Sequence, residues 1–137
     1  MKIKLLIFFL LLISANLIAQ QKPAYVLYNA KGEKVSYKKM IRQLSEKNIV
    51  LFGEFHNNPI AHWLELAVSK DLSQKNEIVF GAEMFEADNQ QALNDYLSGK
   101  LTAKGLDSAA RLWSNYKTDY APLVNFAKEK KAPFIAT

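Results

Sequence analysis

The sequence of 137 residues contains no cysteine. This absence excludes a disulfide framework, a zinc site built on thiolates, thiol catalysis and lipid attachment through an N-terminal cysteine. The sequence also lacks the Gly-x-Ser-x-Gly elbow of serine hydrolases, the His-Glu-x-x-His metal motif and a phosphate-binding glycine loop.

An excess of one charge is also missing. Lys and Arg number 18 against 13 Asp and Glu, and the net charge of +5 falls to about +3 if Lys2 and Lys4 are removed with the N-terminal segment. Basic and acidic residues are interspersed, which argues against a nucleic-acid partner, and the basic stretch 128–131 is typical of a solvated helix end. Because half of the residues are hydrophobic, the chain can bury the core of one domain.

The N-terminal residues 1–20 have a basic start, an apolar run from Leu5 to Ile13 and a more polar end. This run is too short to span a bilayer and predicts a secretory signal peptide, with an uncleaved anchor as the alternative. Ala19 suits the position before the cut, although Leu17 replaces the small residue expected two positions earlier. We expect an exported protein, periplasmic or associated with the outer membrane, whose mature domain is 21–137 and which is not a Cys-anchored lipoprotein.

The remaining chain is predicted to alternate strands and helices. A strand-turn-strand is expected at 24–37, and apolar stretches at 49–52, 77–85 and 132–137 predict three core strands. The continuously apolar stretch at 49–52 suits a strand covered on both sides, so the class is α/β, a parallel-rich layered sheet with helices on both faces. Since the sequence stops after the third core strand, we expect it to be truncated there, the N-terminal part of a larger protein.

Capping residues predict where the helices begin and end. Ser36 suits the start of the first helix, Asn58 followed by a proline suits the second, and Gly99 suits the end of the third. Thr118 or Asp119 is expected to cap the last helix. The buried stripe of the second helix is expected at five positions: Ile60, Trp63, Leu64, Ala67 and Val68.

Polar residues follow the first two core strands at the point where each ends. Glu54 and His56 follow the first, and Glu83 follows the second. In open α/β sheets ligands bind outside the carboxyl ends of the strands, so we expect these three side chains on one rim. The N-terminus of the helix after Asn58 points free N–H groups at the same rim.

Each of these residues also has a purely structural interpretation. Glu54 would serve as a cap or a partner for a surface lysine, and His56 as a hydrogen-bonded loop residue. His62, on the second helix, is a weaker site candidate, since histidines there more often pack or face solvent. Two carboxylates and an imidazole suit either a divalent metal such as Zn²⁺ or general-base catalysis without metal.

The segment 112–123 contributes three large aromatic residues. Trp113 is expected in the core, and Tyr116 is expected to be partly exposed. Tyr120 falls in the first turn of the last helix, and a phenolate is a ligand of ferric haem. Tyr116 and Tyr120 are therefore added to the candidate residues of the rim.

Four motifs together resemble one known family. "VLFGEFHNNPIAH", "VFGAEMFEADNQQALNDYLSG", "W-x2-Y-x3-Y-A-P-L" and "APFIAT" are similar, in this order and spacing, to the motifs of the ChaN-like haem-binding uptake family. The Tiki/TraB and erythromycin-esterase groups are its distant relatives. The resemblance runs from about residue 49 to residue 137, and members of the family are roughly twice as long as this chain, with many of them lipoproteins.

The resemblance implies an exported bacterial haem-binding protein with an α/β fold, which takes part in haem or iron uptake. It implies that haem is held between two protomers of a homodimer and that an outer-membrane uptake system is a partner. Glu54, His56 and Glu83 match the family's polar rim, and Tyr120 matches a recurrent tyrosine, so either Tyr120 or His56 is expected to ligate the haem iron. We expect a binding protein rather than an enzyme.

Two alternatives to haem binding stay open at this point. A metal-dependent or His-based hydrolase of the Tiki or erythromycin-esterase type would use Glu54, His56 and Glu83 as catalytic residues. A fold without ligand would use the same side chains only for structural hydrogen bonds.

Overall fold

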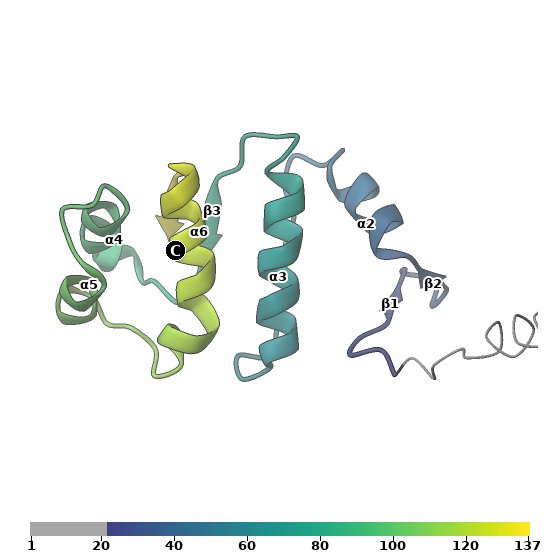
Figure 1. The fold of residues 1–137 in the computed structure, drawn as a ribbon, viewed down its shortest axis with the longest axis horizontal. Helices are drawn as coiled ribbons and strands as arrows, with labels where there is room; N and C mark the ends of the chain where they lie inside the picture. The colour runs from purple at the N-terminus through teal and green to yellow at the C-terminus, as the bar shows by residue number, and fades with distance from the viewer. Residues whose placement is uncertain (1–21) are drawn as a thin grey trace, which may run out of the picture.

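The computed structural model describes residues 22–137, so the predicted signal peptide lies outside the described residues. Figure 1 shows an N-terminal hairpin and helix, a long central helix and a C-terminal group of helices with two short strands. The elements follow one another in this order: β1 Leu27–Tyr28, β2 Lys34–Val35, α2 Tyr37–Leu44, α3 Pro59–Leu72, β3 Phe80–Ala82, η1 Ala87–Asn89, α4 Gln90–Leu97, α5 Ala103–Ala109, η2 Tyr116–Tyr120, α6 Ala121–Lys130 and β4 Phe134–Ala136.

The N-terminal hairpin and the helix after it form as predicted. Strands β1 and β2 pair antiparallel. Between them the Asn29 side chain accepts hydrogen bonds from the backbone N–H groups of Lys31 and Glu33, and Gly32 has the positive φ of 75° that the turn requires. The hydroxyl of Ser36 accepts from the N–H of Lys39 and caps α2.

Helix α3 begins as predicted but buries a different face. The Asn58 side chain accepts from two backbone N–H groups of the first turn, and a proline occupies the first helical position. Of the expected stripe, Val68 is buried, whereas Ile60 and Trp63 are 38% and 54% exposed. The deeply buried positions also include His62, because the helix turns this side towards the polar site described below.

Strands β3 and β4, predicted within 77–85 and 132–137, pair in parallel with Phe80 opposite Phe134 and Ala82 opposite Ala136. These side chains belong to the core or pack against it, and the rings of Phe80 and Phe134 stack at 5.5 Å. The α/β class is therefore confirmed. Within residues 22–137 the helices cover the face of the pair that holds Phe80 and Phe134. The other face, with Val79 and Ile135, is exposed in this part of the chain.

The first core strand, expected at 49–52, is not paired within the described residues. Ile49 and Leu51 are 78% and 92% exposed, whereas Val50 and Phe52 are half-buried. This alternation has the period of a strand covered on one face, not on both. The prediction of a strand covered on two sides was wrong because residues 22–137 supply neither a neighbouring strand nor a second layer there.

The C-terminal helices enclose the core of the molecule. Helix α4 ends as predicted at Gly99, which has a φ of 84°. The expected capping of α6 by Thr118 or Asp119 was wrong, since both lie in the π-helical turn η2 that precedes α6. Residue Tyr120 takes the N-cap position without a side-chain capping bond. Buried side chains from β3 to β4 form the core, among them Phe85, Leu93, Leu106, Val124 and Phe134.

The outer edge of β4 is occupied by a side chain rather than by a strand. Gln90 donates from Nε2 to the carbonyl of Phe134 at 3.0 Å, and its Oε1 accepts from the N–H of Ala136 at 2.8 Å. The amide of Gln90 thus satisfies both backbone groups on that edge. No helix among the described residues is long and apolar enough to cross a membrane.

Candidate functional site

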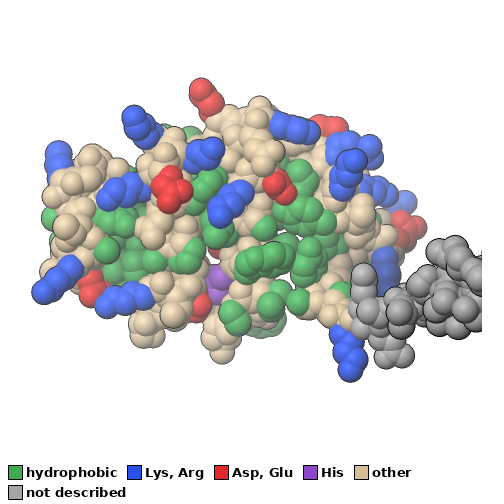
Figure 2. Space-filling model, viewed as in Figure 1, with side chains coloured by type: hydrophobic (Ala, Val, Ile, Leu, Met, Phe, Trp, Pro, Cys, Tyr) green, Lys and Arg blue, Asp and Glu red, His purple; other side chains and the backbone are tan. Residues whose placement is uncertain are grey.

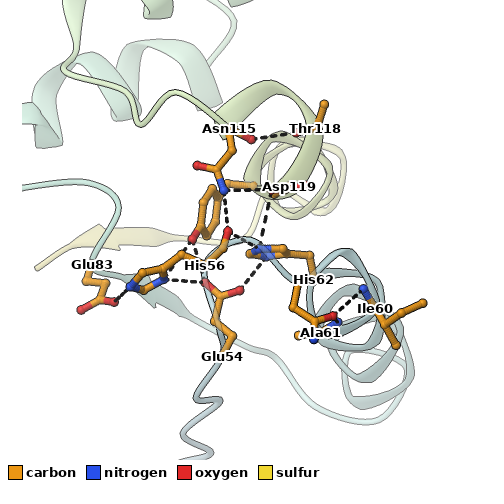
Figure 3. Close-up of polar contacts among 11 residues, drawn as sticks. Glu54, His56, Ile60, Ala61, His62, Glu83, Asn115, Thr118 and Asp119 are labelled. Carbon is orange, nitrogen blue, oxygen red and sulfur yellow. Dashed lines mark hydrogen bonds and ion pairs between the residues drawn. The ribbon is translucent and has the colours of Figure 1, made fainter. Parts of the chain in front are cut away.

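The ends of the first two predicted strands meet, as the sequence indicated (Figure 3). The Nδ1 atom of His56 lies 3.4 Å from Oε1 of Glu54, and its Nε2 atom lies 3.7 Å from Oε1 of Glu83. Three side chains from two separate segments therefore form one polar group, with His56 in the middle.

His62 lies at the buried side of this group. It is 5% exposed, and its Nδ1 approaches Oε2 of Glu54 at 2.8 Å, a charge contact whose angle is not that of a hydrogen bond. Its Nε2 lies 3.1 Å from the carbonyl oxygen of His56. Both ring nitrogens thus face oxygens, one of a carboxylate and one of a backbone carbonyl. The sequence placed His62 among weak candidates, but the structure puts it at the base of the site.

Tyr120 joins the group from the start of α6. Its hydroxyl donates to Oε1 of Glu54 at 2.8 Å and lies 3.3 Å from Nδ1 of His56, while its ring packs edge-on against that of His62. Tyr120 is 4% exposed. Burial, followed by the hydrogen bond to Glu54, raises the pKa of Tyr120 well above its usual range. The phenol therefore stays protonated and acts as a donor.

Two residues of the site were missed in the sequence. The Nδ2 group of Asn115 donates to the carbonyl of His56 and to Oδ2 of Asp119 at 2.8 Å. The same Asp119 oxygen lies 3.9 Å from Nε2 of His62. Asn115 and Asp119 are four residues apart, a spacing that places them side by side on a helical turn. The sequence does not show that this turn, η2, packs against α3 beside His62. Together Asn115 and Asp119 hold the loop around His56 in place.

Glu65 is a further acid that the sequence did not single out. It lies on α3, three residues after His62, a spacing that places both on one side of a helix. Burial and, to a lesser extent, the nearby negative charge of Glu54 raise the pKa of Glu65 to about 7, against the opposing effect of His62. The inner part of the site therefore holds several acids around one buried imidazole.

The outer part of the site is open to solvent. The side chains of His56 and Glu83 are 54% and 74% exposed, whereas that of Glu54 is 13% exposed. The ring of Trp113 meets the His56 ring edge-on at 4.7 Å, and Phe55 is 78% exposed next to it. An incoming molecule can thus reach His56 and Glu83 directly, but reaches Glu54 only through them.

Tyr116, the remaining candidate, lies in the core rather than on the surface. It is 7% exposed and packs edge-on against Phe85, so the expectation of partial exposure was wrong. Burial raises the pKa of its hydroxyl above the usual range. It lines a separate cavity of about 420 Å³ with Tyr96 and Leu106.

The positions of the nitrogen and oxygen atoms in this site indicate which metal or cofactor it can bind. Within residues 22–137 no cluster of three or more His, Asp or Glu side chains is arranged to hold a metal ion. Glu54 is already engaged by His62 and Tyr120. The imidazole of His56 is 54% exposed, with its Nδ1 3.4 Å from the carboxylate of Glu54 and its Nε2 at the longer distance of 3.7 Å from that of Glu83. A metal-ligating histidine typically has this arrangement, in which its second nitrogen binds a carboxylate.

Comparison with known proteins connects this site to one family. The family described as "Haem-binding uptake, Tiki superfamily, ChaN" matches residues 40–137, which include every residue of the site. Among solved structures the chain is similar to ChaN of Campylobacter jejuni, described as showing cofacial heme binding, with 22% identity and a TM-score of 0.65 over 82% of this chain. The match covers 47% of that chain, so this chain spans about half the length of its structural relative. No curated protein sequence matches. The chain belongs to the ChaN-like haem-binding uptake family of the Tiki superfamily.

Proposed function

We propose that this chain binds haem through the exposed edge of His56 and serves in haem or iron uptake outside the cytoplasm. The observation that carries the proposal is the orientation of His56, whose Nδ1 faces Glu54 and Tyr120 while Nε2 faces Glu83, a side chain that is 74% exposed. A carboxylate on the inner nitrogen fixes the ring and makes the outer nitrogen a better iron ligand. Family membership supports haem as the ligand, and the haem iron would supply the acceptor for Nε2.

Glu83 does not prevent this use of His56. Its carboxylate lies 3.7 Å from Nε2, and its side chain is 74% exposed. A contact of this length between exposed groups is weak, so Glu83 can move aside when a ligand approaches. We infer that Glu83 lines the entrance to the site.

Tyr120 is proposed as a supporting residue rather than as the iron ligand. Its hydroxyl is buried and already donates to Glu54, and its raised pKa disfavours the phenolate that iron would need. It lies within reach of Nδ1 of His56 and so helps to hold the imidazole. His56 is thus the proposed ligand of the two that the sequence indicated.

The surroundings of His56 suit a flat apolar molecule. Trp113 contacts the imidazole with its ring, and Phe55, the residue before His56, is 78% exposed. Figure 2 shows histidine surface in a furrow of the visible face, with hydrophobic side chains nearby and Lys and Arg spread around the periphery. Apolar side chains would contact the porphyrin, and the basic side chains would attract its propionates.

Export, a homodimer and an outer-membrane uptake system belong to the same proposal. The N-terminal residues 1–20 support export. The description of the Campylobacter jejuni protein as cofacial supports haem groups that meet face to face, which two protomers would provide. The uptake role rests on the family description.

A hemin titration of the purified chain, followed by absorbance, tests this proposal. Binding should shift the Soret band, and His56→Ala should weaken binding by about tenfold or more and change the band position. Tyr120→Phe should keep the band position with weaker binding. Tyr28→Phe, an exposed change in the distant hairpin, is the control. An unchanged spectrum and affinity in His56→Ala would contradict His56 as the ligand.

A further inference from the structure

A cavity that is separate from the site around His56 lies among the C-terminal helices. It has a volume of about 420 Å³ and is lined by residues of α4, α5, η2 and α6 and of the loop before η2. Helix α4 contacts both α5 and α6, and Figure 1 shows the three at one end of the molecule. The cavity and the site around His56 share the turn η2 but no residue.

The floor of this cavity is apolar and aromatic. Tyr96, Leu106 and Tyr116 line it, and each is more than nine-tenths buried. Leu112 and Ala121 add half-buried apolar walls. All five side chains belong to the hydrophobic core or pack against it, so the fold fixes their positions. The volume falls in the range of small-molecule sites, about 300 to 1,000 Å³.

The hydroxyl of Tyr116 has no hydrogen-bond partner among residues 22–137. The neighbouring hydroxyl of Tyr96, by contrast, donates to Oδ1 of Asn125 at 2.6 Å. Buried polar groups in proteins are nearly always hydrogen-bonded, because an unpaired one costs free energy. Burial raises the pKa of Tyr116 above its usual range, so the phenol keeps its proton. The cavity therefore holds a donor that needs an acceptor.

The rim of the cavity carries more positive than negative charge. Two lysines and one aspartate, Lys104, Lys117 and Asp107, give the lining a net charge of +1. The Nζ atom of Lys117 lies 3.2 Å from Oδ2 of Asp107, and the two side chains are 78% and 45% exposed. An ion pair this exposed is weak, so a bound anion can compete for Lys117. Lys104 has no ion-pair partner in the part of the chain that the structure describes.

The unpaired hydroxyl and the charged rim belong to one neighbourhood. The negative charge of Asp107 contributes to the raised pKa of Tyr116, which indicates that its carboxylate lies near the phenol. Lys117 contacts the same carboxylate. One ligand group at this point can thus meet both the Tyr116 hydroxyl and the Lys117 ammonium group.

We propose that this cavity binds a small aromatic carboxylate. Its ring would pack against Tyr96 and Tyr116, since aromatic rings favour edge-on or offset contacts with one another. Its carboxylate would accept from the Tyr116 hydroxyl and pair with Lys117 and Lys104. A single negative charge matches the net charge of the lining, whereas a phosphate would bring nearly two.

The test is a titration of the 15N-labelled chain with 2-naphthoate, followed by amide NMR shifts in the absence of hemin. We expect saturable shifts at residues 103–107 and 116–117, with a dissociation constant of about 1 mM or lower. 2-Naphthylmethanol has the same rings without the carboxylate. It should bind at least about tenfold more weakly.

Variants of the lining separate the two kinds of contact. Tyr116→Phe should weaken 2-naphthoate binding by about three- to tenfold and leave the stability of the chain unchanged, because the hydroxyl has no partner to lose within residues 22–137. The double variant K104Q and K117Q should weaken it by at least about tenfold. Tyr28→Phe and the double variant K31Q and K34Q, all in the N-terminal hairpin, are the matched controls and should keep the affinity.

Four results would overturn the proposal. They are the absence of saturable shifts with 2-naphthoate, equal affinity for 2-naphthylmethanol, unchanged affinity of the K104Q and K117Q variant, and shifts that centre on His56 instead of on the cavity. Because no hemin is present, none of these results depends on whether the chain binds haem.

Discussion

The two strand ends that build the site look alike in sequence but differ in the folded chain. Each has a glycine followed by an acid, Gly53-Glu54 in one and Gly81-Ala82-Glu83 in the other. The Glu54 side chain is 13% exposed and contacts two histidines and a tyrosine, whereas Glu83 is 74% exposed with one contact at 3.7 Å. The acid that organises the site is therefore distinct from the acid that meets the solvent.

This difference arises from what packs behind each strand end. Helix α3 and η2 lie behind the first end and bring His62 and Asp119 towards Glu54. After the second end Met84 and Phe85 turn into the core, Glu83 stays exposed, and Arg111 pairs instead with Glu86 and Asp88. The neighbouring elements thus decide whether the acid after the glycine is buried and supports the site, as Glu54 does, or is exposed at its entrance, as Glu83 is.

The largest expected effect is that of His62→Ala. Removal of the buried imidazole would leave a cavity and would take away the neighbour that lies 2.8 Å from the Glu54 carboxylate, which should lower the free energy of unfolding by about 3 kcal/mol. Urea unfolding at neutral pH measures this change. His56→Ala is the matched control and should change stability by less than about 0.5 kcal/mol, because that ring is exposed. Equal losses of stability in His62→Ala and His56→Ala would contradict the view that the buried histidine stabilises the fold and the exposed one does not.

A pH-dependent effect is expected for Glu65→Gln. The folded-state pKa of Glu65, about 7, lies above the value of 4.5 taken for the unfolded chain. The wild-type chain should therefore lose stability as pH rises from 4.5 to 7, since the unfolded chain gives up this proton in that range while the folded chain still holds it.

The variant cannot ionise at this position, so its stability should exceed that of the wild type by about 1 to 2 kcal/mol at pH 8, after allowance for solvent screening, and match it near pH 4. Urea unfolding across this pH range measures the difference. Glu83→Gln serves as the control, and a difference that does not depend on pH would contradict the inner position of Glu65.

A smaller effect is expected for Tyr120→Phe. This change removes the hydroxyl that donates to Glu54 while keeping the ring against His62. The loss of one hydrogen bond to a buried carboxylate should cost about 1 kcal/mol. Chemical unfolding measures this cost, and Tyr28→Phe in the exposed hairpin should cost nothing measurable. A neutral Tyr120→Phe would show that Glu54 does not depend on this donor.

The smallest effect on stability is expected for Glu83→Gln. The side chain is exposed and its contact with His56 is long, so the free energy of unfolding should change by less than about 0.5 kcal/mol. Its effect should appear in hemin affinity, since the group lies at the entrance to His56. A clear loss of stability would show that the outer end is also structural.

Local signals made much of the fold predictable. Ser36, Asn58 and Gly99 mark helix ends through hydrogen bonds or backbone angles that each residue type favours, independent of the rest of the chain. The apolar stretches around Phe80 and Phe134 likewise predict two strands, and the α/β pattern of the chain favours their parallel pairing. The pairing of 49–52 was not predictable, because a strand needs a neighbour and its apolar sequence does not show whether one is present.

The site was predictable in its outer residues only. Glu54, His56 and Glu83 follow strands, so the general geometry of α/β sheets places them together. The burial of His62 and the roles of Asn115 and Asp119 depend on how η2 meets α3. That contact involves residues more than fifty positions apart, and no short pattern encodes it.

The amide of Gln90 protects one edge of the small parallel sheet from pairing with a further strand. By binding the carbonyl of Phe134 and the N–H of Ala136, it closes the β4 edge against any added strand. In a Gln90→Ala variant both backbone groups would lose their partner, and the β4 edge would be free to pair with a strand of another molecule.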